Sequence, residues 1–183
     1  MSLVHIYVAP GFEEVELITI ADVLRRCEID TQLVSLSEEL LISGAHQISV
    51  AADLPFSAAS DSPDLIVLPG GGPGTAALMA HTALHQRLQQ QIAANARVAA
   101  ICAAPMVLAK IGLLQGKNAC CYPGCESALI AGGANISAYN VTSDGLITTS
   151  RGPATAALFA LELAAQLKGH QIAHEVGKAM LYL

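Results

Sequence analysis

The stretch of sequence that decides the fold is Val98-Ala99-Ala100-Ile101-Cys102-Ala103-Ala104-Pro105. An apolar run of strand length ends at Cys102, and Pro105 suits the first turn of a helix, where its missing N–H costs nothing. The small neighbours Ala103 and Ala104 leave room for a tight turn. This pattern predicts a nucleophile elbow, a sharp turn that lifts a reactive side chain out of a sheet.

The cysteine of this turn is the first candidate for chemistry. A thiol at a helix start faces free backbone N–H groups and the positive end of the helix dipole. Both favour the thiolate, which is the nucleophilic form. We therefore expect Cys102 to be reactive and ionised at neutral pH. The alternative is that Cys102 is simply a small buried apolar side chain, as most free cysteines are.

Outward from this turn, apolar runs of strand length alternate with helical patterns. Strands are expected at residues 3–9, 31–35, 65–68, 98–101, 140–142 and 146–149, with a flap at 41–52 and a hairpin turn at 144–145. Helices are expected at 13–27, 84–94, 103–111, 152–168 and from 171 onward. Such alternation indicates an α/β fold, with a mostly parallel central sheet between two layers of helices. No linker divides the chain, so residues 1–183 are expected to form a single domain.

Composition excludes several classes of protein. Hydrophobic residues make up 53% of the chain, charged residues 13%, and the net charge is −6. Because there is no run of Lys and Arg, we expect no nucleic-acid surface and no anionic membrane as partner. No apolar stretch is long enough to span a bilayer, and residues 1–5 carry no secretory signal pattern.

The cysteine count favours a reducing compartment. The chain has five cysteines, an odd number: Cys27, Cys102, Cys120, Cys121 and Cys125. A disulfide framework is therefore not expected, and the cytoplasm is the expected location. The spacing at residues 120–125 is not that of a common structural zinc site, so no metal is expected. A thiol there that resolves an oxidised Cys102 is the alternative.

A second candidate lies at the start of the first helix, where three glutamates follow Pro10-Gly11-Phe12. Glu13 and Glu14 are expected to complement the helix dipole. Glu16 shares an inward helical stripe with Ile20, Val23 and Cys27. A buried carboxyl has a raised pKa and stays protonated, so Glu16 can donate a hydrogen bond to a thiolate. The alternative is a glutamate at the helix edge, in water.

Two further strand ends carry unusual residues. The run 70–74, Gly-Gly-Gly-Pro-Gly, lacks the Gly-Lys-Ser/Thr of a phosphate loop and the spacing of a dinucleotide site. We interpret it as a close backbone approach whose N–H groups, with that of Ala103, form an oxyanion hole. An ordinary turn is the alternative. Arg151 follows the last strand and either binds an anionic group or forms a structural salt bridge, the role that we favour.

Together these pieces resemble the ThiJ/PfpI superfamily, in the branch of the parkinsonism-associated protein and bacterial YajL. The matching segments occur in family order along the whole chain, at residues 9–16, 68–71, 99–105 and 149–153. The resemblance implies a flavodoxin-like sandwich and a homodimer. It also implies a nucleophilic or oxidisable Cys102, a protonated partner at Glu16, and oxyanion donors at Gly71 and Ala103.

The sequence departs from the family pattern at three positions. Tyr122 stands where members often carry a histidine, so a base is missing there; a phenol is a poor base near neutral pH but can hydrogen-bond a substrate. Ala103 follows the cysteine where the protease-like branch has histidine, so a Cys-His protease is not expected. At the flap, His46 stands where relatives carry an arginine.

The resemblance implies a stress-response function. The first hypothesis is glyoxalase or deglycase activity on glyoxal, methylglyoxal and their glycated adducts, with Cys102 as nucleophile and no metal or organic cofactor. The second is a non-catalytic oxidative-stress sensor or redox-regulated chaperone that acts through oxidation of Cys102. An older family label, thiazole monophosphate biosynthesis, finds no support in these residues.

Overall fold

A computed structural model describes residues 2–183; Met1, the first residue of the expected single domain, lies outside the described residues. A seven-stranded sheet runs through the centre in the order β10-β11-β7-β6-β1-β2-β5. Every pairing is parallel except β10–β11. The strands are β1 (Leu3–Val8), β2 (Asp30–Ser35), β5 (Leu54–Pro55), β6 (Leu65–Leu68), β7 (Arg97–Ile101), β10 (Val141–Asp144) and β11 (Ile147–Ser150).

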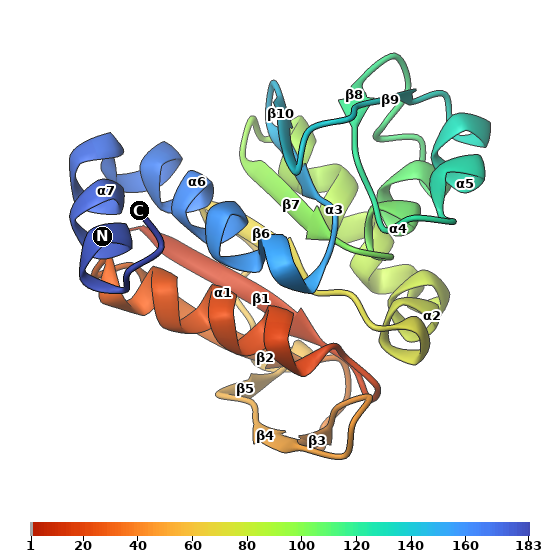
Figure 1. The fold of residues 1–183 in the computed structure, drawn as a ribbon. Coiled ribbons are helices and arrows are strands. Elements are labelled where there is room, and N and C mark those ends of the chain that lie inside the picture. The colour runs from red at the N-terminus through yellow and green to blue at the C-terminus, as the bar shows by residue number, and fades with distance from the viewer. Residues whose placement is uncertain (1) are drawn as a thin grey trace.

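Helices cover both faces of this sheet. They are α1 (Glu14–Arg26), α2 (Gly72–Ala80), α3 (Thr82–Ala93), α4 (Pro105–Lys110), α5 (Glu126–Ala131), α6 (Ala156–Lys168) and α7 (His170–Ala179). Along β1, Ile6 joins the apolar cluster beneath α1 and α6, whereas Tyr7 joins the cluster on the opposite face. Helices α1 and α6 lie side by side (Figure 1). This confirms the three-layer α/β fold.

Two expectations from composition concern membrane-spanning segments and disulfide bonds, and each can be compared with the structure of residues 2–183. None of the helices within residues 2–183 has the length and apolar character needed to cross a membrane. All five cysteines lie in this range, and all are free.

The structure differs from the sequence prediction in local detail. The glycine run at 70–74 is not only a turn, because α2 begins inside it at Gly72. The helix expected directly after Cys102 begins at Pro105, because residues 102–104 form a turn in which Cys102 has a positive φ. Two-residue strands β8 (Asn118–Ala119) and β9 (Asn135–Ile136) pair in parallel and flank α5, and no pattern predicted these three elements.

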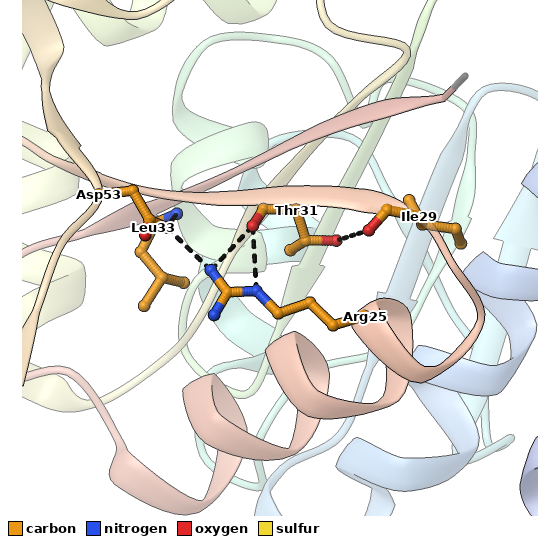
Figure 2. Close-up of polar contacts among 5 residues, drawn as sticks. All are labelled: Arg25, Ile29, Thr31, Leu33 and Asp53. Atoms are coloured by element: carbon orange, nitrogen blue, oxygen red, sulfur yellow. Dashed lines mark hydrogen bonds and ion pairs between the residues drawn. The ribbon is translucent and has the colours of Figure 1, made fainter.

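A polar junction fixes the far end of α1. Figure 2 shows the Arg25 guanidinium between Thr31 and Asp53. Its Nη2 donates to the Thr31 carbonyl at 2.9 Å and to Asp53 Oδ2 at 2.8 Å, and Asp53 Oδ2 also accepts from the Leu33 amide at 2.7 Å. The junction ties α1 to β2 and to the loop before β5, so the helix that carries Glu16 has a fixed position against the sheet.

The loops that matter for function meet at one edge. The parallel strands β1, β6, β7 and β11 all end there, and the segments that follow them begin with Ala9, Pro69, Cys102 and Arg151. In open sheets of this type, ligands bind beyond the carboxyl ends of the strands. The small hairpin of β3 (Leu41–Ser43) and β4 (Ser49–Ala51) forms the expected flap beside the start of α1 (Figure 1).

Candidate functional site

Cys102 occupies a strained turn between β7 and α4. Its φ is +66°, a left-handed conformation that side chains other than glycine rarely adopt and that is found disproportionately at functional sites. Its amide donates to the Ser150 carbonyl at 2.9 Å, and its carbonyl accepts from the Tyr122 amide at 2.8 Å. The backbone is therefore held from both sides. The cysteine is 8% exposed, so it is almost fully enclosed at this turn.

Glu16 projects from α1 toward this cysteine and is fully buried. Its Oε2 accepts from the Gly70 amide at 2.8 Å, and its Oε1 has no hydrogen-bond partner within residues 2–183. Gly70 lies against both side chains. A Cβ added there would stand 2.6 Å from the Cys102 Cβ and 2.7 Å from Glu16 Oε2. Only glycine allows the cysteine and the glutamate to meet at this point.

The surroundings shift the pKa of both groups. Burial raises the pKa of Glu16 to about 7, although the neighbouring Cys102 thiol and the Gly70 N–H oppose the rise. Burial also raises the pKa of Cys102 to about 12, reinforced by the negative charge of Glu16, while the N–H groups of Gly71 and Ala103 lower it. The helix start alone therefore does not hold the thiol ionised, contrary to the sequence expectation.

Cys102 and Glu16 shift one another's pKa: the thiol lowers that of Glu16, and the charge of Glu16 raises that of Cys102. Loss of the first proton, near pH 7, leaves one negative charge that lies mostly on Glu16, with a minor state in which the proton is on Glu16 and the charge is on sulfur. When the proton is on Glu16, the carboxylate no longer repels the sulfur, and the amides of Gly71 and Ala103 stabilise the thiolate. The same state supplies a nucleophile and an adjacent acid.

The two predicted oxyanion donors lie at the sulfur. The N–H groups of both Gly71 and Ala103 act on the Cys102 thiol. Gly71 has a φ of +92°, and a Cβ there would lie 2.6 Å from the Glu13 amide, so this position also requires glycine. The structure thus brings together Cys102, Glu16, Gly71 and Ala103.

Tyr122 and Arg151 lie to one side, around a hollow of about 340 Å³. The guanidinium of Arg151 forms no ion pair or hydrogen bond with any residue from 2 to 183, so the favoured structural salt bridge is not found. Only its backbone N–H is engaged, donating to the Asn140 carbonyl at 3.1 Å. The Tyr122 ring stands beside Gly152, where an added Cβ would approach Cδ2 to 3.1 Å.

Glu14 and His46 are residues whose joint role the sequence did not reveal. Glu14 is buried and holds the flap: its Oε1 accepts from the His46 amide at 2.6 Å, and its Oε2 lies 2.8 Å from His46 Nδ1. Burial alone would raise the pKa of Glu14, but the hydrogen bonds from His46 and Ile48 hold it below its usual value. The partners are 32 residues apart, so no local pattern predicts their contact.

The same pair, with Glu13, is the one group of acidic and histidine side chains within residues 2–183 whose ligand atoms all approach within 4.8 Å. Glu13 Oε2 is 3.8 Å from His46 Nδ1. The Glu14 oxygens are already used by the His46 amide and ring. We therefore assign the group to attachment of the flap.

Comparisons with known proteins agree with this geometry. The family model described as DJ-1/PfpI family matches residues 2–166. Protein dj-1beta of Drosophila melanogaster is 37% identical over 177 residues, 96% of this chain and 95% of the relative. Its crystal structure superposes with a TM-score of 0.93 over 99% of this chain and 98% of that one.

Two other relatives bear on the chemistry. The Caenorhabditis elegans protein named glutathione-independent glyoxalase DJR-1.2 is 30% identical over 158 residues, 86% of this chain and 83% of the relative. A solved structure of Toxoplasma gondii DJ-1, described as oxidized, is 32% identical with a TM-score of 0.92 and covers 99% of this chain and 98% of that one. The fold, the cysteine elbow and these matches lead to one conclusion: this chain belongs to the DJ-1/PfpI family.

Proposed function

We propose that this protein is a cysteine-dependent enzyme that converts small 2-oxoaldehydes, glyoxal and methylglyoxal among them, to 2-hydroxy acids, and that it also acts on their glycated adducts as a deglycase. The observation that carries the proposal is the contact of Cys102 and the fully buried Glu16 across Gly70, with two backbone N–H groups at the sulfur. The glyoxalase name of the C. elegans relative supports it.

The first step is addition of sulfur to the aldehyde. It begins from the state in which the proton resides on Glu16 and Cys102 is a thiolate. The sulfur forms a bond to the aldehyde carbon, and the carbonyl electron pair moves to oxygen. The N–H groups of Gly71 and Ala103 stabilise that developing charge. Glu16 then gives its proton to the oxygen, which leaves a neutral hemithioacetal and a carboxylate.

The second step moves hydrogen between the two carbons. The Glu16 carboxylate removes the proton from the former aldehyde carbon, the electron pair forms a double bond to the neighbouring carbon, and the oxygen of that carbon takes the negative charge as an enediolate. The hydroxyl proton of the first carbon passes to this oxygen, and Glu16 returns its proton to the neighbouring carbon, which gives a 2-hydroxy thioester on Cys102. Water then attacks the thioester, the C–S bond breaks, and the 2-hydroxy acid and the thiolate are released. This sequence draws on no metal or organic cofactor.

Tyr122 fits this scheme as a group that orients substrate. Its side chain is about half exposed at the hollow beside the cysteine. A phenol donates a hydrogen bond at neutral pH but is a poor base, so no proton transfer is assigned to it. Because Glu16 then serves as both acid and base, we expect turnover to be modest.

The test is formation of lactate from methylglyoxal, followed by NMR. Wild type produces lactate, and Cys102→Ala produces none, because the carbon–sulfur bond cannot form. Cys125→Ser is the matched control, since this thiol is free and partly exposed but is not at the site. Equal turnover by wild type and Cys102→Ala would overturn the proposal.

A second function, an oxidative-stress sensor or redox-regulated chaperone, is favoured by the Toxoplasma relative described as oxidized. The thiolate would attack one oxygen of a peroxide, releasing water and leaving a sulfenic acid; a second peroxide would give the sulfinic acid. Protonated Glu16 and the amides of Gly71 and Ala103 would then hydrogen-bond the new oxygens. A two-oxygen adduct on Cys102 by mass spectrometry, without lactate formation, would support this function.

The proposal also includes a homodimer in the cytoplasm, with small aldehydes or glycated adducts, and no nucleic acid or membrane, as partners. Val15 and Ile18 on α1 and Leu158 on α6 are large apolar side chains exposed on two adjacent helices. Apolar surface of this kind is what a self-complementary interface buries. Five free thiols are consistent with a reducing compartment.

A further inference from the structure

The hollow beside Cys102 is joined to the reactive turn on two sides. One wall is the segment that contains Tyr122, whose amide donates to the Cys102 carbonyl. The other wall starts at Arg151, the residue after Ser150, whose carbonyl accepts from the Cys102 amide. The hollow has a volume of about 340 Å³, enough for several non-hydrogen atoms of a small molecule. Both walls of the hollow are therefore anchored to the backbone of Cys102.

The polar groups that line this hollow are donors without partners. The side chains of Arg151, Tyr122 and Asn140 make no hydrogen bond with any residue from 2 to 183. The hydroxyl of Thr155, in contrast, is occupied by the Gly152 backbone at 2.8 and 3.0 Å. The free donors face the hollow from both walls.

The charge in the hollow is positive. No acidic residue is among those that line it: Tyr122, Pro123, Asn140, Arg151, Gly152, Pro153, Ala154 and Thr155. The nearest acid in sequence, Glu126, accepts a hydrogen bond from the Gly124 amide at 2.7 Å and forms no ion pair with Arg151. The guanidinium is therefore a free cation at the hollow, and its charge lowers the pKa of the neighbouring Cys121 thiol against the effect of burial.

We propose that this hollow binds the carboxylate of an anionic 2-oxoaldehyde and that Arg151 is the residue that determines this specificity. The inference rests on the proposed function and names its substrate class. A guanidinium matches a carboxylate with two parallel N–H donors, whereas glyoxal and methylglyoxal have no group that reaches it. Tyr122 and Asn140 supply further donors.

The test compares two substrates that differ in one charge: 4,5-dioxopentanoate and its neutral methyl ester. Wild type is expected to show a kcat/KM about tenfold higher for the carboxylate, as one charge-assisted contact provides. In Arg151→Gln this ratio falls to about one, and Arg151→Lys restores part of it. Arg26→Gln is the matched control, because Arg26 pairs with Asp22 on the surface of α1, and it keeps the wild-type ratio.

A second measurement needs no turnover. The rate at which iodoacetamide alkylates Cys102 is followed with added 2-hydroxyglutarate, the product expected from 4,5-dioxopentanoate, or with its dimethyl ester. The acid protects wild type at about tenfold lower concentration than the ester, and Arg151→Gln abolishes that difference. If no substrate is turned over but this protection is seen, the subsite stands and the proposed reaction fails. Equal protection by acid and ester in wild type would overturn the subsite.

Discussion

At the scale of single residues, the chemistry depends on the proton that Cys102 and Glu16 share. Burial raises the pKa of Glu16 to about 7, so the first proton that the pair loses near neutral pH comes mostly from the carboxyl. Burial and the resulting carboxylate charge raise the pKa of Cys102 to about 12, so the rate of alkylation by iodoacetamide should still be rising above pH 9, the ordinary thiol value. Glu16→Gln removes the carboxylate charge, so the midpoint of the thiol should move lower.

Alkylation is measured by mass spectrometry across the pH range, with Glu175→Gln as control. Glu175 is a carboxylate on α7, far along the chain, that pairs with Gln171 on the surface. An identical pH profile in wild type and Glu16→Gln would show that the charge of Glu16 does not act on the thiol.

The raised pKa of Glu16 also predicts how stability depends on pH. The folded pKa, about 7, lies above the ordinary value of 4.5, so the fold binds this proton more tightly than the unfolded chain does. The contribution of protonated Glu16 to the free energy of unfolding is complete below pH 4.5 and is lost as pH rises through 7. The shift corresponds to roughly 3 kcal/mol. Glu16→Gln should therefore be more stable than wild type at pH 8.

Denaturant unfolding between pH 5 and 8 tests this prediction. His5 acts in the opposite direction, because burial lowers its pKa, so its stabilising effect grows as pH rises toward 6.5 and is complete above that value. That residue is the same in both proteins, so the difference between wild type and Glu16→Gln isolates Glu16. A difference in stability that stays constant with pH would contradict a buried, titrating carboxyl.

Some residues of the site could be predicted from the sequence and others could not. Cys102 follows from a strand that runs into a proline-marked helix start, and Glu16 from its place on an apolar helical stripe. The pKa of Cys102 was not predictable, because it depends on the charge of a residue that only the fold brings near. That the guanidinium of Arg151 has no partner within residues 2–183 likewise depends on which residues the fold brings near it.

At the scale of elements, the flap is attached to α1 by Glu14 and His46. The hydrogen bond with Glu14 raises the pKa of His46. Protonated His46 therefore stabilises the attached flap fully below pH 6.5, and this stabilisation is lost as pH rises through the folded pKa of His46. The pKa of Glu14 is lowered, so ionised Glu14 stabilises the attached flap above pH 4.5, and this stabilisation is lost as pH falls. The attachment is therefore strongest between about pH 4.5 and 6.5.

Hydrogen exchange at residues 44–48 measures this attachment. After correction for the intrinsic rate, wild type should lose protection between pH 6 and 8, whereas Glu14→Gln should be less protected at pH 6 and should change little. Ser49→Ala is the control, since it removes a hydrogen bond to Ser43 within the hairpin but leaves the link to α1. Equal protection of wild type and Glu14→Gln at pH 6 would contradict a role for this pair.

The elements that the sequence did not predict share a physical cause. Glycine and proline at residues 70–74 favour a turn, yet α2 starts at Gly72 because Pro73 suits a first helical turn. Strands β8 and β9 have two residues each, too few for any periodicity, and Asp144 fixes β8 by accepting from the Asn118 amide at 2.8 Å. Long segments such as α1 and α6 were predicted because their apolar residues recur at helical spacing over several turns.

At the scale of the whole molecule, the proposed homodimer is the property that remains to be tested. Val15 and Ile18 are three residues apart on α1, so they share one helical face, and both are about half exposed. If α1 lies at a two-fold axis, each copy presents Ile18 to the other. A carboxylate placed there would be buried without a partner, at a cost of about 3 kcal/mol or more.

Ile18→Glu should therefore raise the dissociation constant of the dimer by about a hundredfold or more. Light scattering after gel filtration should then give twice the chain mass for wild type and a single chain mass for the variant at micromolar concentration. Leu181→Glu is the matched control, because Leu181 is the most exposed large apolar side chain within residues 2–183, at 89%, and follows the end of α7 rather than lying on α1. A wild-type monomer would refute the dimer, and a dimer that survives Ile18→Glu would move its interface away from this face of α1.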